Sequence, residues 1–467
     1  ATRAAAPEVA QLSRYTERWR RLLDQRWTEL ATLDGHRVDA VDRAVPFFGE
    51  LIALLTDLGL AEEAFVASEQ GRARALADLL AARDAGRGAG ADRALPGAGE
   101  LDRSALLAVL RAHGRPVVEY FRTDDRLTVW TVRLVDGEPE FAVQVRDLTA
   151  TTLSEDIAAV HALLEAGGSD PKQRDQTTVL LRRLHATLWE PVVTGWLPAD
   201  PDLPVTVVGH QDLLLVPFPA LLDLTGQPLG LRHAIEILPA TALLATLRPR
   251  LAARPARPPR LAALVNPTMP PPGAGGPVRV LPRLAKTEEY FPVVSACYPD
   301  RATVVTGPDA TLDALRRLAP DADVLILATH AEATTPTRQD PLRAFVTLAP
   351  TVSHNGLVGV EELADLRIGA DLVVLSACRT GGGVVTGDGV VGLSRAFLAA
   401  GPTKIVMTLV EVHEWASLWF MVRLHRFWLT DGHPLPAAFR RAYQEQYQEM
   451  PTDPRYWGGF VLFGVSA

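Results

Sequence analysis

The sequence predicts an α/β fold, in which a mainly parallel sheet is flanked by helices and preceded by a helical N-terminal segment. In the first hundred positions, apolar residues recur at three- and four-residue spacing, which is typical of amphipathic helices. Beyond residue 260, short continuous apolar runs alternate with helical patterns, as expected of strands that are covered on both faces. The 467 residues, 48% of them hydrophobic, are enough to form more than one domain.

The N-terminal segment, residues 1–90, is predicted to be helical. Amphipathic patterns cover 6–33, 44–58 and 61–85, and Gly59 is a typical helix stop. The turn sequence LGLAEEAF resembles one tetratricopeptide-type unit. Three copies at a fixed period are not found, so a plain helical bundle is the alternative. A linker rich in Gly, Ala and Pro follows at 86–100.

The middle of the chain, residues 101–250, is predicted to be an α/β unit. Asp136-Gly137 is a hairpin-turn sequence that joins two of its strands. The expected strands cover 116–121, 127–134, 141–145, 203–208 and 213–216, and the expected helices cover 152–166 and 172–190. The stretch LAARPARPPR at 251–260 marks the next boundary.

The C-terminal unit, residues 256–467, is predicted to hold the parallel part of the sheet. Its expected strands cover 261–265, 302–306, 324–328, 372–377, 405–409 and 460–463. Its expected helices cover 287–297, 312–318, 389–400, 415–429 and 435–447. In sheets of this kind, ligands and chemistry lie at the carboxyl ends of the strands.

Composition excludes several classes of protein. A net charge of -8 argues against a protein that coats nucleic acid, and two cysteines argue against a disulfide-rich secreted scaffold. We find no apolar run of about 18 residues that lacks charges or breakers, so we expect no membrane span, and the polar N-terminus lacks an apolar signal core. The cytoplasmic location that we expect is implied by the family resemblance described below. The missing initiator methionine predicts that the sequence is trimmed at its N-terminus.

Two reactive residues follow predicted buried strands. His330 ends the stretch VLILATH, and Cys378 ends the stretch LVVLSAC. If the two strands are neighbours, an imidazole and a thiol emerge at one sheet edge, where the imidazole can activate the thiol as a nucleophile. The backbone N–H groups of Ala331 and Cys378 are then candidate donors to a tetrahedral oxyanion. Taken singly, such a cysteine is more often a small buried hydrophobe and such a histidine a structural group.

Three other motifs suggest different chemistry and are weaker. GDGVVG at 387–392 fits a dinucleotide-binding fingerprint, but it does not directly follow a strand. HEWAS at 413–417 has Ser where a zinc peptidase needs a second His, and GLSRA at 392–396 lies within a predicted helix. We therefore expect no cofactor and no metal. The aromatic residues at helical spacing from Trp415 onward are expected to serve packing.

Cys378 and its surroundings resemble the CHAT family, caspase-like domains that often accompany tetratricopeptide repeats. His330 lies 48 residues before Cys378, which is similar to the caspase-type spacing. The resemblance covers about residues 100–467 and includes the segments VVEYFRTDDRLTVWTV, DLLLVPFPALLDLTGQPLG, LATHAEA, GLVGVEELADLRIGADLVVLSACRTGGGVVTGDGVVGLSRAFLAAG and PRYWGGFVLFG.

The resemblance implies a cysteine endopeptidase in which His330 is the general base and Cys378 the nucleophile. It implies that residues 101–250 form the inactive caspase-like half, which packs against the catalytic half. Relatives act inside bacterial cells, often in defence, where a helical module controls cleavage of a partner such as a gasdermin. The expected partners are thus a protein substrate and a regulatory protein bound through the helical segment, with no membrane and no direct nucleic-acid contact.

The sequence departs from the family pattern at its substrate-binding segments. The family commonly has an acidic residue where Arg379 stands, and a Leu-Trp-x-Val-Asp-Asp segment where this chain has LVEVHE at 409–414. Asp388, Glu411 and Glu414 are candidates to line a pocket for a basic side chain, whereas Arg379 favours an acidic one; solvated charges are the simpler interpretation of all four. The departures also leave a second hypothesis open, a catalytically degenerate interaction scaffold.

Overall fold

The computed structural model describes residues 34–72, 74–86, 102–166, 170–254, 257–273, 280–333, 344–376, 383–386 and 389–467. The strands are β1 (Val117–Arg122), β2 (Arg126–Val135), β3 (Glu138–Asp147), β4 (Pro204–Val208), β5 (Ala234–Leu238), β6 (Leu261–Pro267), β7 (Ala302–Gly307), β8 (Val324–Ala328), β9 (Ala331–Ala333), β10 (Ala344–Thr347), β11 (Leu357–Gly359), β12 (Leu372–Ser376), β13 (Gly383–Thr386), β14 (Gly389–Gly392), β15 (Lys404–Thr408) and β16 (Phe460–Gly464). Most of them match the predicted apolar runs.

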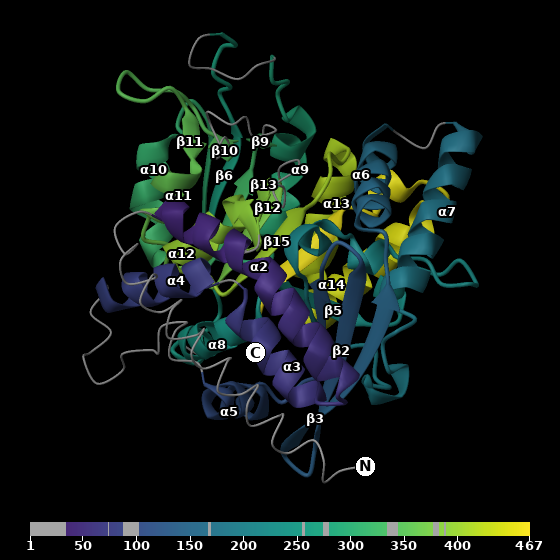
Figure 1. The fold of residues 1–467 in the computed structure, drawn as a ribbon. Coiled ribbons are helices and arrows are strands. Elements are labelled where there is room, and N and C mark those ends of the chain that lie inside the picture. Colours follow the sequence, from purple (N-terminus) through teal and green to yellow (C-terminus); the bar gives the residue numbers. More distant parts are fainter. Residues whose placement is uncertain are drawn as a thin grey trace.

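Helices flank these strands (Figure 1). They are α2 (Asp34–Asp57), α3 (Ala61–Gln70), α4 (Arg74–Gly86), α5 (Arg103–His113), α6 (Ala150–Ala166), α7 (Pro171–Leu188), α8 (Leu244–Ala252), α9 (Ala285–Ser295), α10 (Leu312–Leu318), α11 (Val360–Ala364), α12 (Leu393–Ala400), α13 (Glu414–His425) and α14 (Leu435–Glu449). A π-helical turn, Arg426–Thr430, continues α13. The predicted helix over 6–33 and most of the 86–100 linker lie outside the described residues.

One sheet of eleven strands runs through the described part of the chain, in the order β3-β2-β1-β4-β5-β16-β15-β12-β8-β6-β7. Most neighbouring strands are parallel; β1–β3 form an antiparallel meander, and β16 is antiparallel to β15. The mainly parallel sheet flanked by helices confirms the predicted fold class. Strand β16 also pairs with β5, where Phe463 lies opposite Ile237, so the predicted middle and C-terminal units share one sheet.

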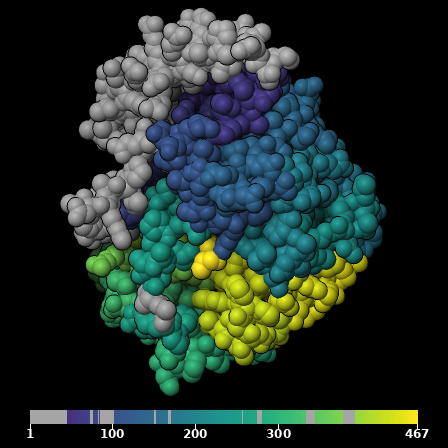
Figure 2. Space-filling view, turned by 90° about the horizontal axis from the view of Figure 1, so that it is seen from below, coloured from purple at the N-terminus to yellow at the C-terminus, as the bar shows by residue number. Residues whose placement is uncertain are grey.

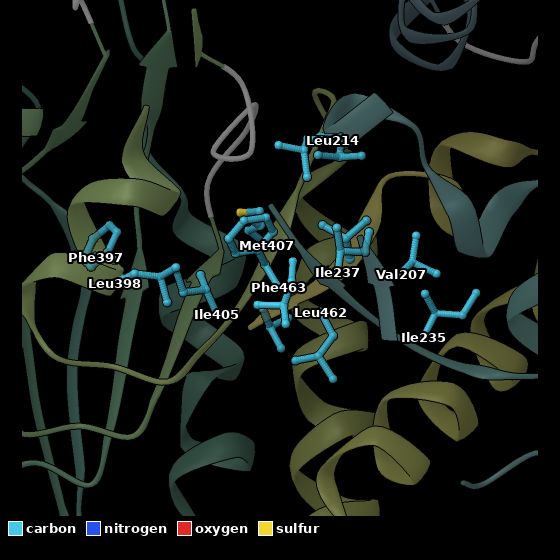
Figure 3. Packing of buried hydrophobic residues seen from close by; sticks show 14 of the residues in the cluster. Val207, Leu214, Ile235, Ile237, Phe397, Leu398, Ile405, Met407, Leu462 and Phe463 are labelled. Atoms are coloured by element: carbon cyan, nitrogen blue, oxygen red, sulfur yellow. The ribbon is translucent and has the colours of Figure 1, made fainter. Parts of the chain in front are cut away.

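The apolar core is continuous across the β5–β16 junction. Figure 3 shows Ile237 of β5 beside Phe463 of β16, with Met407 of β15 close by. All three side chains are buried. Figure 2 shows the yellow C-terminal residues beside the blue and teal residues of the N-terminal half. At the C-terminus, the Ser466 N–H donates to the Glu236 carboxylate of β5 at 2.8 Å. Burial of this apolar surface is the main force that holds the two halves together.

The N-terminal helices pack directly on the antiparallel part of the sheet. The Phe65 ring of α3 lies 6.0 Å from the Trp130 ring and 5.2 Å from the Phe141 ring, measured between centroids. The Trp130 indole N–H donates to the Ala61 carbonyl at 3.0 Å. Because Phe65 and Trp130 are fully buried, this contact excludes water from both surfaces.

Two predicted elements are wrong in type. The expected strand at 213–216 is a 3-10 turn, Gln211–Leu215, and Pro217 follows it, a residue that cannot donate to a strand ladder. The expected helix over 389–400 begins only at Leu393, because Gly389–Gly392 form β14 and pair antiparallel with β13. The β-branched pair Val390-Val391 favours a strand there.

Candidate active site at the carboxyl ends of the parallel strands

Strands β8 and β12 are parallel neighbours and end at the same level. Ala328, the last residue of β8, lies opposite Ser376, the last residue of β12. The Thr329 N–H donates to the Ser376 carbonyl at 3.2 Å, so the pairing continues one residue past β8. The expected meeting of imidazole and thiol depends on the two strands being neighbours; the structure meets this condition, and His330 follows directly at this edge.

Three of the predicted site residues, Cys378, Arg379 and Asp388, lie outside the described residues. In the sequence Cys378 follows Ser376 by two residues, and His330 follows Ala328 by two residues. The two residues thus hold the same offset from a pair of Cα partners. Their pairing as a catalytic dyad stays a prediction.

The imidazole of His330 is oriented by a backbone carbonyl. Its Nε2 lies 2.8 Å from the carbonyl oxygen of Pro282, in the segment that leads into α9. A carbonyl only accepts hydrogen bonds, so Nε2 carries the proton and donates it. In the neutral imidazole, the basic lone pair then resides on Nδ1. This arrangement fixes both the tautomer and the direction of the ring.

The backbone after His330 turns into a second, three-stranded sheet of order β11-β10-β9. The Thr347 N–H donates to the His330 carbonyl at 2.8 Å, and the Thr329 hydroxyl donates to the Thr347 carbonyl at 2.6 Å. With this register Ala331 and Val346 form a non-hydrogen-bonded pair. The Ala331 N–H therefore points away from β10. This is the direction required of a group that donates a hydrogen bond to a ligand on the opposite side of β9.

The two predicted glutamates lie after the next parallel strand, β15. Glu411 is exposed, and its backbone N–H donates to the Glu165 carboxylate at 3.2 Å. Glu414 is half-buried, and its Oε1 accepts the Thr287 N–H at 2.7 Å. Glu411 thus lies at the rim of the predicted site, whereas Glu414 satisfies a free N–H in the first turn of α9 and ties α9 to α13.

Comparison with known proteins identifies the family. The model of the CHAT domain matches residues 178–465, which is more than half of the chain. The chain belongs to the CHAT family. The mouse (Mus musculus) protein "Tetratricopeptide repeat protein 28" is 38% identical over 111 residues, and its human (Homo sapiens) counterpart is 35% identical. The match covers 23% of this chain and only 4% of these relatives.

Solved structures confirm the caspase-like form of the fold. Two crystal structures of the Saccharomyces cerevisiae separase–securin complex align with TM-scores of 0.59 and 0.56. They cover 95% and 97% of this chain but 37% and 40% of the separase chain, at 10% and 9% identity. Because identity is this low, the likeness concerns the fold alone. This CHAT chain thus has a caspase-like fold.

The glycine-rich segment of this CHAT chain lacks the context of a dinucleotide site. Its second half is β14 of an antiparallel hairpin, whereas the fingerprint needs a strand that turns directly into a helix within a parallel unit. In the HEWAS motif, His413 Nδ1 accepts the Trp415 N–H at 3.3 Å and Glu414 caps α9. Within the described ranges, no group of three or more His, Cys, Asp or Glu residues is placed to hold a metal ion.

Cys297, the other cysteine, lies in a different environment. It is half-buried just after α9, and burial raises the pKa of its thiol, although a hydrogen bond from Thr430 at 3.9 Å acts in the opposite direction. A thiol with a raised pKa carries little thiolate at neutral pH and reacts slowly. Cys297 is therefore an internal reference for the reactivity of Cys378.

None of the helices in the described part of the chain is long and apolar enough to cross a membrane.

Sequence reasoning missed three groups at this edge: the Pro282 carbonyl, Glu332 and Thr347. The carbonyl contact depends on tertiary placement, so no local signal could have found it. Glu332 follows His330 by two residues, and in an extended chain such residues share a face. That spacing would have placed Glu332 on the same face as His330 if the residues after His330 had been recognised as a strand.

Proposed function

We propose that this CHAT chain is a caspase-like cysteine endopeptidase, with His330 as the general base and Cys378 as the nucleophile. The observation that carries the proposal is the oriented imidazole: the His330 ring donates from Nε2 to Pro282 at the end of β8, which leaves Nδ1 as the basic atom. A histidine held by a third group in this way is a recurring element of activated nucleophiles.

The equal offset of His330 and Cys378 supports this pairing. Neighbouring strands lie about 4.8 Å apart, and two residues extend a chain by about 7 Å at most. Ala328 and Ser376 are Cα partners, and only two residues follow each of them before His330 and Cys378. The two segments are therefore too short to move far apart before they reach these residues. A dyad suffices for cysteine, because its thiol needs less activation than a serine hydroxyl.

In the proposed reaction, Nδ1 of His330 takes the thiol proton of Cys378, and the thiolate attacks the scissile carbonyl carbon. The N–H groups of Ala331 and Cys378 stabilise the oxyanion of the tetrahedral intermediate. The intermediate collapses, the C–N bond breaks, and the imidazolium returns its proton to the leaving amine. Water then hydrolyses the acyl-enzyme with His330 again as the base.

We further propose that the substrate is a protein and that the helical N-terminal part regulates cleavage. The comparison structures are of separase in complex with securin, which supports a protein as the partner of this chain. In this chain α4 packs against α12, the helix that follows the β13–β14 hairpin and therefore the Cys378 segment in the sequence. A ligand that shifts α4 would therefore also act on α12.

Three variants test the dyad: Cys378→Ala, His330→Ala and, as a matched control, Cys297→Ala. Digestion of a peptide library, followed by mass spectrometry, measures cleavage by each variant. We expect the first two to lose at least three orders of magnitude in kcat/KM and the control to keep its activity. Cleavage that is equal in wild type and in both dyad variants would reject the proposal.

Alkylation by iodoacetamide distinguishes the protease from the second candidate, a degenerate interaction scaffold. The scaffold is favoured by the structural use of Glu414, which caps α9 in the segment where the family pattern is replaced. A protease predicts that Cys378 is alkylated faster than Cys297 and that His330→Ala slows this reaction, because the imidazole raises the thiolate fraction. Equal labelling of both cysteines, unaffected by His330→Ala, would favour the scaffold.

A further inference from the structure

The three-stranded sheet β11-β10-β9 presents His330 on a face with other polar side chains. Glu332 lies opposite Phe345, and the Thr347 N–H bond to the His330 carbonyl places Thr347 opposite His330. Opposite residues of neighbouring strands share a face, and so do residues two apart in one strand. His330, Glu332, Phe345 and Thr347 therefore share one face, to which β11 adds Leu357, opposite Thr347.

The two faces of this small sheet differ in burial. Ala344, Val346 and Val358 on the other face are buried in the apolar core. On the His330 face, His330, Glu332, Phe345 and Leu357 are only half-buried, and Thr347 alone is fully buried. The His330 face is thus the accessible one, with two apolar side chains beside the polar groups.

Two polar atoms on the accessible face lack hydrogen-bond partners. Oε2 of Glu332 and Oγ1 of Thr347 are both buried as atoms, and neither has a hydrogen-bond partner among the residues that the structure describes. Leaving a buried acceptor unpaired is costly, so native structures rarely retain one without a function. Here the two unpaired atoms flank the proposed general base.

We infer that Glu332 and Thr347 form a subsite for a lysine or arginine side chain of the substrate. The inference rests on the proposed protease function and adds its substrate class. An ammonium or guanidinium group offers only donors, which match a carboxylate and a hydroxyl oxygen. Phe345 and Leu357 provide apolar surface for the methylene stem of such a side chain.

The position of Glu332 places the basic residue close to the scissile bond. Residues two apart in a strand are separated by about 6.6 Å, roughly the length of two residues of extended peptide. A substrate whose scissile carbonyl lies at His330 therefore brings a side chain within one or two residues of that bond to Glu332. An acidic side chain, which Arg379 would favour, would be repelled by this carboxylate.

Binding to the Cys378→Ala variant tests the subsite without requiring turnover. The probes are fluorescent hexapeptides in which arginine, its neutral isostere citrulline or glutamate is fixed at one position at a time, and anisotropy measures Kd. We expect the best arginine peptides to bind about 10- to 100-fold more tightly than their citrulline counterparts, the range for charge-assisted hydrogen bonds. Equal binding of arginine and citrulline peptides, or tighter binding of glutamate peptides, would overturn the inference.

Variants of Glu332 and Thr347 test whether these two residues cause the preference for arginine peptides. In the Cys378→Ala background, Glu332→Gln should abolish the arginine preference and Glu332→Asp should keep part of it, whereas the exposed Glu361→Gln is a matched control that should leave the preference unchanged. Thr347→Val removes an unpaired buried hydroxyl, so it should weaken arginine binding without lowering the melting temperature. A preference that survives Glu332→Gln would refute the assignment even if the dyad variants confirm the protease.

The outcomes separate the two proposals. If arginine peptides bind as expected but wild-type protein neither cleaves peptides nor alkylates faster at Cys378, the subsite stands and the protease function fails. If wild type cleaves peptides without any preference for basic residues, the protease stands and the subsite fails.

Discussion

The α4 helix is held to α8 and α12 by a charged contact that a single substitution can break. Arg250, near the end of α8, donates from Nε to Asp84 Oδ2 at 3.0 Å and from Nη2 to Asp84 Oδ1 at 2.8 Å. Its Nη1 donates to the Leu398 carbonyl of α12 at 2.7 Å. One guanidinium thus joins α8, α4 and α12. We expect Arg250→Met to release the C-terminal half of α4.

The free energy that Arg250→Met costs depends on how well the Arg250–Asp84 pair is shielded from solvent. The side chains of Arg250 and Asp84 are 10% and 15% exposed. Removing one partner of a fully buried pair costs about 3–5 kcal/mol, and slight exposure places the cost near the lower end, at about 3 kcal/mol. In contrast, the pair Arg83–Asp365 on the same helix end is 34% and 70% exposed, so Arg83→Gln should cost about 1 kcal/mol or less.

Amide hydrogen exchange, read by mass spectrometry on α4 peptides, measures this local opening directly. A loss of about 3 kcal/mol corresponds to exchange that is faster by about two orders of magnitude, whereas Arg83→Gln should accelerate it by about fivefold or less. Asp84→Asn combined with Arg250→Met should cost less than the sum of the single variants, because both remove one contact. Exchange in Arg250→Met within fivefold of wild type would refute the reasoning.

Three further predictions concern stability. His113 is buried and donates to the Thr206 hydroxyl at 2.8 Å. Burial lowers the pKa of its imidazole to about 3, and the positive charges of two nearby arginines lower it in the same direction. As pH falls, the unfolded chain therefore takes up this proton before the folded chain does. His113 alone should lower stability by about 1.4 kcal/mol per pH unit below 6.5, and urea unfolding of His113→Gln at pH 8 and pH 5 should show a loss of stability about 2 kcal/mol smaller than that of wild type. Phe65→Ala should cost about 3–5 kcal/mol in thermal unfolding, because it empties the contact between α3 and the sheet. Glu414→Ala should cost about 0.5–2 kcal/mol, read as faster amide exchange at Thr287, because it removes a cap from α9.

The sequence predicted most of the parallel strands because they are continuous apolar runs between turn residues, but it missed β5, in which Glu236 interrupts the apolar run. It placed His330 and Cys378 after the ends of two such strands, whereas the finding that these strands, β8 and β12, are neighbours comes from the structure. It failed where the structure depends on distant contacts. Strands β9–β11 are three or four residues long and are stabilised by pairing rather than by local pattern. The Pro282 carbonyl reaches His330 only after the chain has folded, and the apolar run at 213–216 becomes a turn because Pro217 follows it.

The helical N-terminal part is bound to the sheet by buried charges as well as by apolar contact. Arg72 at the end of α3 lies 3.4 Å from Glu119 of β1, and the side chains are 1% and 0% exposed. The Ser68 hydroxyl also donates to Glu119 at 2.9 Å, and Thr241 donates to it at 2.8 Å. Burial raises the pKa of Glu119 well above its usual range despite the neighbouring arginine. This carboxyl group is thus buried beneath α3, and the hydrogen bonds from Ser68 and Thr241 offset part of the cost of its burial.

A chain shortened to residues 102–467 should therefore fail to fold as an independent catalytic unit. It would expose the apolar surface around Trp130 and remove Ser68 and Arg72, which partner Glu119. We expect it to bind a dye for exposed apolar surface and to unfold without a sharp transition. A shortened chain that melts cooperatively and keeps full activity would contradict this reasoning. If the prediction holds, the regulation proposed above cannot proceed by detachment of these helices.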